Sequence, residues 1–426
     1  MVAAAALAAA LAGAALLVDP AAEASFDAPK RAAALLFVAV AAAAAFLWPS
    51  RRVGTPLRSL WRGARRSSRI VLVLALAALG GAVVSALASP RQAASLDALR
   101  GLLVFSLLLP LGASRVTTRY GRPLLLLFFG LCAVNLTVSL LQGWGIYRPL
   151  PIEVTGARAA TGAFAGNVGY LALALALAGV AAMALAVESR RPATRVLAAV
   201  GLALSVADLV VNQNLTSLTA LAAGALALLL ARRGRRAFLP IVGVAALAAA
   251  AFAIYRPAQT RLADAVAAAR TGDWDALLTY RLGPWSAAAE MARERPVTGF
   301  GPGTFSAEFV RHRLAAEIRA RRRYVNPLVT SSYGEAHSEP LQAVAEGGLA
   351  GVAAIGAFVA LLAALARAAR RGGPASAEAA LLLSMLVAGG IGALTWFPLQ
   401  RPISAIPLLL AAGRGWRISA ESGEAP

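Results

Sequence analysis

Residues 164–187 read FAGNVGYLALALALAGVAAMALAV and contain no charged side chain. An apolar run of about 18 residues or more can cross the hydrocarbon core of a bilayer as a helix. Comparable runs recur along the 426 residues of the chain, near 2–18, 32–49, 70–88, 100–113, 123–143, 196–212, 217–231, 237–255, 339–366, 378–395 and 403–413. The sequence therefore predicts an all-α fold, a polytopic membrane helix bundle of about twelve transmembrane helices.

The overall composition agrees with a membrane protein. Hydrophobic residues make up 59% of the chain and charged residues 14%, with a mean hydropathy of +0.69. In an average soluble domain, charged residues make up roughly a quarter of the chain. The net charge of +21 would suit a nucleic-acid partner if it formed one surface. The arginines instead stand in short clusters between apolar runs, which is typical of membrane topology signals, so we predict no nucleic-acid partner.

The basic residues of the short connections are distributed unequally between the two sides of the membrane. With twelve helices, 22 of them fall on the side of both termini and 7 on the opposite side. Because cytoplasmic connections are enriched in Lys and Arg, we predict cytoplasmic N and C termini in a bacterial inner membrane. The run at 2–18 lacks the basic start of a signal peptide, so we interpret it as a membrane helix.

The predicted helices divide the chain into three parts. Helices 1–9 occupy residues 1–255, a large extracytoplasmic loop occupies 256–338, and helices 10–12 with a cytoplasmic tail occupy 339–426. The loop is partly helical, because Trp285–Arg295 and Phe305–Arg323 have helical spacing. The second stretch mixes apolar and basic residues, which indicates either a helix at the membrane surface or a solvated helix that covers the bundle.

Both histidines of the chain, His312 and His337, lie in this loop. His337 stands just before a long apolar run and between Glu335 and Glu339. A histidine in this place can act as a general base near neutral pH, and a carboxylate partner would orient its ring. The alternative is a polar side chain at the interface without a chemical role.

Phosphate binding is the other chemistry that the loop can support. The sequence has no His, Cys and Asp spacing of a metal site and no Gly-rich phosphate loop between a strand and a helix. We therefore predict neither a metal nor a cofactor. Arginine would then bind phosphate, because its planar fork holds two oxygens and stays charged. The candidates on the outer side, each alternatively a solvated side chain, are Arg158, Arg256, Arg261 and Arg281.

Parts of the loop resemble the O-antigen ligase and O-antigen polymerase family. The matching residues are Arg281-Leu-Gly-Pro-Trp285, Arg295-Pro-Val-Thr-Gly-Phe-Gly-Pro-Gly-Thr-Phe305, Ala336-His337-Ser338, Leu341-Gln342 and Glu346-Gly-Gly-Leu-Ala-Gly351. Weaker matches are Arg158-Ala-Ala-Thr-Gly162-Ala-Phe164 and Trp396-Phe-Pro-Leu-Gln-Arg-Pro402. In motif, the resemblance covers about one sixth of the chain, although the predicted topology agrees over most of it.

The resemblance implies a metal-independent, inverting glycosyltransferase at the outer face of the inner membrane. Such an enzyme moves a glycan from a polyprenyl-diphosphate carrier, such as undecaprenyl diphosphate, to a hydroxyl of a lipid-linked sugar acceptor. It implies that His337 deprotonates the acceptor and that Arg281 contacts the diphosphate. We place four further residues in substrate binding: Arg158, Arg256, Glu335 and Trp285.

The chain departs from the family pattern at two places. A Ser-Arg pair of the family is replaced by Asn214-Leu-Thr-Ser-Leu218, and Ser338 stands where an Asn is usual. One diphosphate contact is therefore missing, or is supplied by a residue such as Arg158 or Arg256. The sequence leaves open a ligase or a polymerase and, from other classes, a lipid or solute transporter or a scaffold. The predicted spans are nearly free of charge, with Asp208 the clearest buried acid, which favours surface chemistry over transport.

Overall fold

The computed structural model describes residues 1–22, 24–47, 66–145, 162–232, 242–243, 245–246, 249–250, 252–324, 333–371, 373 and 375–421. Every regular element in these ranges is a helix. The α-helices are α1 (Val2–Leu16), α2 (Asp27–Phe46), α4 (Arg66–Leu87), α5 (Gln92–Ser106), α6 (Leu108–Ala113), α7 (Arg115–Gly143), α8 (Val168–Glu188), α9 (Pro192–Val211), α10 (Leu215–Arg232), α12 (Arg256–Thr271), α13 (Trp274–Leu277), α14 (Leu282–Glu294), α15 (Phe305–Ala320), α16 (Glu339–Gly347), α17 (Leu349–Arg370), α18 (Ser376–Ala393) and α19 (Pro402–Glu421). Two 3-10 turns are η2 (Ala163–Ala165) and η3 (Pro398–Gln400).

Nine apolar helical segments in the described part of the chain are long enough to cross a membrane, with α5 and α6 together forming one of them. They coincide with nine predicted runs, and the all-α membrane fold is confirmed. The shorter α1 and the helix α19 occupy two more predicted runs, 2–18 and 403–413. The predicted run 237–255 lies largely outside the described residues, so the count of twelve stays a prediction.

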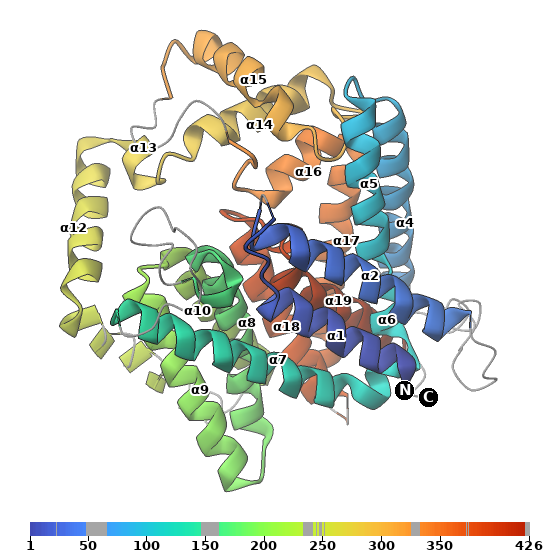
Figure 1. Cartoon of the computed structure of the whole chain (residues 1–426), viewed down its shortest axis with the longest axis vertical. Coiled ribbons are helices and arrows are strands. Elements are labelled where there is room, and N and C mark those ends of the chain that lie inside the picture. The colour runs from blue at the N-terminus through green and yellow to red at the C-terminus, as the bar shows by residue number, and fades with distance from the viewer. Residues whose placement is uncertain are drawn as a thin grey trace.

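The centre of the bundle is α8, the helix that contains most of the apolar run at residues 164–187. Its side chains are buried along nearly the whole length, and it contacts α7, α9, α10, α18 and α19 (Figure 1). Small residues let neighbouring membrane helices approach closely, so that packing rather than solvent exclusion stabilises them. The alternation of Leu and Ala in α8 provides this packing on all its faces.

The predicted run 339–366 is two helices rather than one. Gly348 separates α16 from α17 and has φ of 56° and ψ of −124°. Residues with a Cβ atom rarely adopt this backbone conformation. A Cβ at this position would also collide with the backbone carbonyl of Val297. The long apolar segment therefore begins at Leu349, and α16 is a separate helix outside it.

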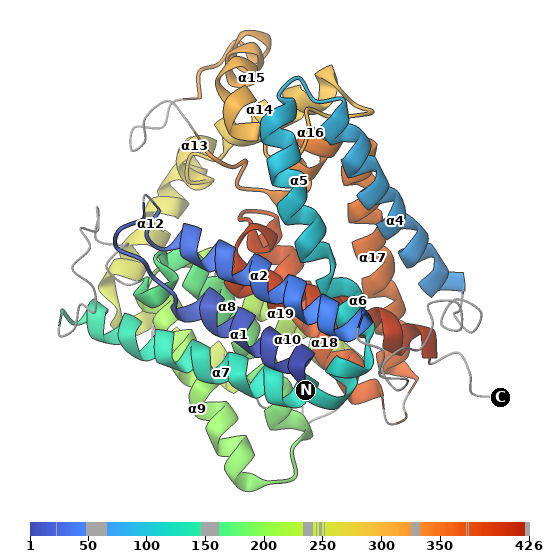
Figure 2. The ribbon, with the colours of Figure 1, turned by 45° about the vertical axis from the view of Figure 1, so that its right-hand side comes forward.

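In its described part, the segment between α10 and α16 contains the helices α12 to α15. The predicted helices at 285–295 and 305–323 are confirmed as α14 and α15, and α12 and α13 were not predicted. In Figures 1 and 2, α14 and α15 lie beyond the ends of α4, α5 and α17. Hydrogen bonds fix them there: the hydroxyl of Ser89 donates to the carbonyl of Phe300 at 2.5 Å, and Arg295 donates to the carbonyl of Ala88 at 3.1 Å.

Candidate active site

The imidazole of His337 is enclosed by aromatic rings from two segments of the chain. Its ring centroid lies 5.6 Å from Tyr333, 5.2 Å from Trp396 and 5.3 Å from Phe397. Trp396 and Phe397 stack on one another at 4.6 Å and belong to the turn between α18 and α19. The loop that precedes α16 and the turn that precedes α19 therefore meet at His337.

Helix α14 forms the third side of the site. The indole N–H of Trp285 donates a hydrogen bond to the backbone carbonyl of His337 at 3.3 Å. The guanidinium carbon of Arg281, which caps the start of α14, lies 5.9 Å from the ring centroid of Trp396. A cation at this distance is attracted to the indole face. The structure therefore brings Arg281, Trp285 and His337 together, three of the residues that the sequence predicted.

Unusual backbone conformations are found on both sides of this contact. His337 has φ of 51°, and the consecutive residues Thr279 and Tyr280, just before Arg281, have φ of 56° and 60°. Non-glycine residues in the left-handed region cost free energy and persist where surrounding contacts hold them, often at functional sites. One such contact is the hydroxyl of Tyr333, which donates to the carbonyl of Tyr280 at 3.2 Å.

Arg401 is a second cation beside His337, and the sequence did not assign it to the site. Its side chain is 15% exposed and forms ion pairs with Asp27 at 2.6 Å and Glu335 at 2.7 Å. Its guanidinium carbon lies 4.2 Å from the ring centroid of Tyr170 and 4.9 Å from that of Phe397. The guanidinium is thus held on several sides, by two carboxylates and two aromatic rings.

The surroundings of His337 favour the neutral imidazole. Burial, followed by the positive charges of Arg281 and Arg401, lowers the pKa of His337 to about 4. Its Nδ1 atom is shielded from solvent and has no hydrogen-bond partner among the described residues. At neutral pH the ring is therefore uncharged, and its buried Nδ1 is not held by a hydrogen bond to a described residue.

The carboxylates that flank His337 make their contacts elsewhere. Glu335 pairs with Arg401, and Glu339 accepts a hydrogen bond from the backbone N–H of Leu399 at 2.6 Å. Burial raises the pKa of Glu339 to about 8, which the hydrogen bonds from the backbone of Leu399 and Gln400 only partly offset. Aromatic rings, rather than the carboxylate partner expected from the sequence, thus enclose the imidazole.

The Gly-rich turn at Gly299–Gly303 is held by Glu346. The carboxylate of Glu346 accepts hydrogen bonds from the backbone N–H groups of Gly303 at 2.9 Å and Phe305 at 3.0 Å. A Cβ at Gly299, which has φ of 65°, would collide with the backbone carbonyl of Glu346. The turn connects α14 to α15, and its conformation depends on contacts with Glu346 at the other end of the matching motifs.

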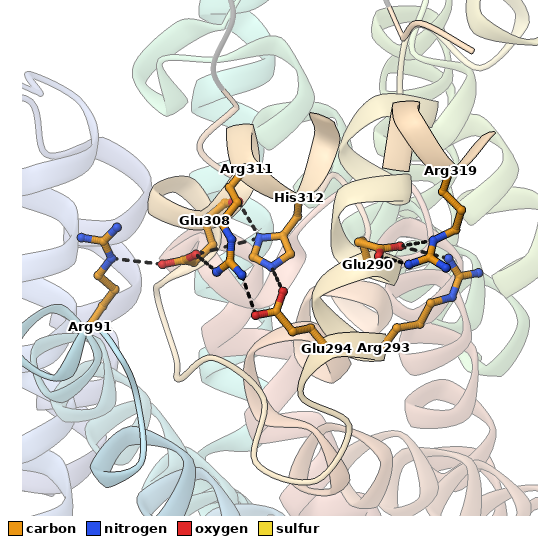
Figure 3. A network of polar contacts seen from close by, with 8 residues as sticks. All are labelled: Arg91, Glu290, Arg293, Glu294, Glu308, Arg311, His312 and Arg319. Atoms are coloured by element: carbon orange, nitrogen blue, oxygen red, sulfur yellow. Dashed lines mark hydrogen bonds and ion pairs between the residues drawn. The ribbon is translucent and has the colours of Figure 1, made fainter. Parts of the chain in front are cut away.

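The second histidine, His312, belongs to a polar network that joins α14, α15 and the start of α5 (Figure 3). Its Nε2 lies 3.1 Å from a carboxylate oxygen of Glu294, and its Nδ1 lies 2.8 Å from the backbone carbonyl of Glu308. Arg91 donates to the carboxylate of Glu308 at 3.0 Å. His312 is 1% exposed, so its role is to hold the helices rather than to meet a substrate.

The remaining predicted residues are placed as follows. Arg256 is exposed on the first turn of α12, and α12 packs on α13 and α9 and stands apart from α16 in both views (Figures 1 and 2). Arg158 lies outside the described residues. Neither residue is brought to His337 in the described part of the structure, so their predicted roles rest on the sequence alone.

The buried carboxylate of Asp208 is hydrogen-bonded within the helix bundle. One carboxylate oxygen accepts from the hydroxyl of Ser139 at 2.7 Å, and the other accepts from the amide of Asn212 at 2.9 Å. Ser139 belongs to α7, so the contact links α9 to α7. A buried polar group with both oxygens occupied in this way stabilises helix packing.

Sequence reasoning missed the contribution of the turn between α18 and α19. Trp396, Phe397 and Arg401 all contact the site, although only the motif resemblance of this stretch pointed to it. Tyr170 and Asp27 were missed because nothing near them in the sequence suggests chemistry. The sequence signal that could have indicated this contribution is the group of aromatic and basic residues in the turn between two apolar runs.

The helices and the site together define a polytopic helical membrane protein with a compact polar region at one end. The family model that matches the chain is described as O-antigen ligase and covers residues 200–356. This range includes Arg281, Trp285 and His337 but ends before the turn at Trp396. The match supports membership of the chain in the O-antigen ligase family and confirms the resemblance of the motifs. No curated protein sequence matches the chain.

Proposed function

We propose that this protein is a metal-independent, inverting glycosyltransferase of the O-antigen ligase type. It transfers a glycan from a polyprenyl-diphosphate carrier to an acceptor hydroxyl at the outer face of the bacterial inner membrane. The proposal places residues 256–338 outside the cytoplasm, in agreement with the distribution of arginines along the sequence. His337 is its general base and Arg281 its diphosphate ligand.

One observation carries the proposal: a shielded, neutral imidazole lies beside two guanidinium groups. A general base must be unprotonated at the working pH, and the low pKa of His337 meets this condition. A departing diphosphate needs positive charge that is already in place. Arg281 can provide this charge, since it stands at the start of α14 next to Trp396.

The transfer step follows from these two groups. His337 takes the proton of the acceptor hydroxyl, and the oxygen forms a bond with the anomeric carbon of the donor glycan. The bond between this carbon and the diphosphate oxygen breaks, and its electron pair stays on the diphosphate. Attack from the side opposite the leaving group inverts the configuration. Arg281 stabilises the charge that grows on the diphosphate.

The same charges couple donor binding to the strength of the base. In the free protein, Arg281 and Arg401 disfavour a proton on His337. A diphosphate bound at Arg281 brings negative charge that offsets this cation, so the pKa of His337 rises when the donor is present. The base therefore becomes able to hold the acceptor proton only in the donor complex, which limits unproductive protonation.

The acceptor separates two activities within the family. A ligase transfers the glycan to a lipid-linked core sugar, and a polymerase transfers it to a second carrier-linked repeat unit. The chemistry at His337 is the same for both. Products formed from a polyprenyl-diphosphate oligosaccharide, with a lipopolysaccharide core or with a second donor molecule as acceptor, distinguish them by mass.

The test is glycan transfer by purified protein in detergent, with EDTA present. We expect turnover that survives EDTA and is lost in His337→Ala and Arg281→Ala. Arg270→Ala provides a matched control, because it removes an exposed arginine from the last turn of α12. Loss of activity with EDTA would refute the metal-independent mechanism, and full activity of His337→Ala would refute the assigned base. A membrane transporter would show lipid or solute movement that does not depend on His337.

A further inference from the structure

Arg401 joins four segments that are far apart in the chain. Its ion pairs reach Asp27 at the start of α2 and Glu335 in the loop before α16. Its cation–π contacts reach Tyr170 at the start of α8 and Phe397 in its own turn. The backbone carbonyl of Arg401 also accepts from the N–H of Ala405 at 2.8 Å, in the first turn of α19.

The local charge argues against Arg401 as a ligand for an anion. The two carboxylates outnumber the one guanidinium, so the cluster of Asp27, Glu335 and Arg401 carries a net negative charge when all three are ionised. Both terminal nitrogens of Arg401 already make short ion pairs, and its side chain is mostly buried. A diphosphate would have to displace two carboxylates to reach it. The arginine that the family pattern lacks is therefore not replaced here.

We propose that Arg401 is a positioning residue that holds His337 in its reactive orientation. This inference rests on the proposed role of His337 as the base. Arg401 anchors Glu335, which stands two residues before His337, and its guanidinium lies over Phe397, which contacts the His337 ring. The loop and the aromatic wall are thus fixed by one side chain.

His337 needs such an anchor because its backbone is not in a relaxed state. Its φ of 51° lies in the left-handed region, which a non-glycine residue occupies only when neighbouring contacts hold it. The contacts on its two sides are the Trp285 hydrogen bond to the His337 carbonyl and the Glu335–Arg401 ion pair. Removal of the second contact leaves the loop free to relax, and the imidazole moves relative to the acceptor.

Several charged or titratable groups face this region, and burial, followed by the cations Arg281 and Arg401, lowers the pKa of His337. They come from the turn before α19, from α14, from α2, from α8 and from its own loop: Arg401, Arg281, Asp27, Tyr170, Tyr333, Glu335 and Glu339. Arg401→Gln removes one positive charge, whereas Arg401→Lys keeps it. The pair of variants therefore separates the charge of Arg401 from its geometry, because a lysine cannot bridge two carboxylates as a planar fork does.

The first experiment follows the protonation of His337 by NMR with labelled histidine. The chain has two histidines, so His312→Gln identifies the remaining signal. We expect the titration midpoint of His337 to rise in Arg401→Gln and to stay at the wild-type value in Arg401→Lys. An unchanged midpoint in Arg401→Gln would overturn the proximity of the two groups, whatever the enzymatic activity of the protein.

The second experiment measures glycan transfer from a polyprenyl-diphosphate oligosaccharide. We expect kcat to fall by about tenfold to a hundredfold in Arg401→Gln and Arg401→Lys, since small misplacements of a reacting group have effects of this size. The KM for the donor should change by no more than about twofold, because a positioning residue does not bind the substrate. A large rise in KM with unchanged kcat would instead identify Arg401 as a substrate ligand and overturn the inference.

Two further variants keep the test decisive. Glu335→Gln cuts the link to the loop but leaves the Asp27–Arg401 ion pair, so it should lower kcat even if an Arg401 variant fails to fold. Arg414→Gln is the matched control, because Arg414 lies on α19, the helix that follows Arg401, and pairs with Glu378 at 2.7 Å. Wild-type kcat in Glu335→Gln would refute the positioning role alone, whereas wild-type activity in His337→Ala would refute the proposed base.

Discussion

The indole N–H of Trp285 and the backbone carbonyl of His337 form a hydrogen bond of 3.3 Å. This contact joins the helix that begins after Arg281 to the loop that contains His337. It involves neither the guanidinium of Arg281 nor the imidazole of His337. The relative position of Arg281 and His337 therefore depends on the indole of Trp285. We expect its removal to act on the rate of transfer.

Trp285→Phe keeps an aromatic ring but removes the N–H donor. The carbonyl of His337 then loses a partner, which costs about 1 kcal/mol in unfolding free energy. We expect a several-fold fall in kcat with little change in KM, measured as glycan transfer in detergent. Trp274→Phe, at an exposed position in α13, is the control and should leave both values unchanged.

The pKa of His337 predicts the acid side of the pH profile. The neutral ring is the active form and its pKa is about 4 in the free protein, so kcat/KM should be constant between about pH 6 and 8 and fall below about pH 5. A fall centred on 6.5, the ordinary histidine value, would mean that the ring is solvated and would contradict the buried site.

Glu339 predicts a dependence of stability on pH. Its pKa rises from 4.5 to about 8 in the folded protein, so the folded state binds a proton that the unfolded state releases. This contribution to stability is present below pH 4.5 and is lost as the pH rises towards 8. Glu339→Gln removes the ionisable group, and its melting temperature relative to wild type should be higher at pH 8.5 than at pH 5.

Measurement of this effect requires thermal unfolding of both proteins in the same detergent at both pH values. The glutamine keeps an oxygen that can accept from Leu399, so the comparison isolates the charge. An equal difference at pH 5 and pH 8.5 would show that Glu339 is ionised in the folded state.

Glu346 is expected to be essential for the order of the Gly-rich turn. Glu346→Ala leaves the N–H groups of the exposed Gly303 and the buried Phe305 without their acceptor. A buried unsatisfied group such as the N–H of Phe305 costs about 1–3 kcal/mol. We expect a large fall in melting temperature and in activity. Glu290→Ala, whose carboxylate forms an ion pair with the exposed Arg319 at 2.6 Å, is the control and should be milder, because it leaves no backbone N–H without an acceptor.

The sequence predicted the helices because membrane spans depend on local composition. The runs at 164–187 and 123–143 needed no knowledge of their neighbours, since about twenty apolar residues form a helix in lipid whatever surrounds them. The break at Gly348 was missed, because its conformation is imposed by the carbonyl of Val297, which lies in another part of the chain.

The sequence predicted only those residues of the site that stand in the family-like motifs of the loop. His337, Arg281 and Trp285 stand in the separate motifs between Arg281 and Gly351, and the structure brings them together. Arg401 and Phe397 contact the same place from the turn before α19, and no local pattern marks them as partners of a histidine. Arg256 resembled a ligand only because it is a basic residue of the loop, and the structure places it on exposed α12.

The ion pair between Arg401 and Asp27 connects residues 374 positions apart. The ribosome therefore synthesises Asp27 near the start of translation and Arg401 near its end. The loop with His337 is made before Arg401, the side chain that anchors it. The insertion machinery must place almost every helix before the base can be oriented. A chain that is halted upstream of Phe397 contains His337 but lacks Phe397 and Arg401, so under the proposed mechanism we expect it to have no transfer activity.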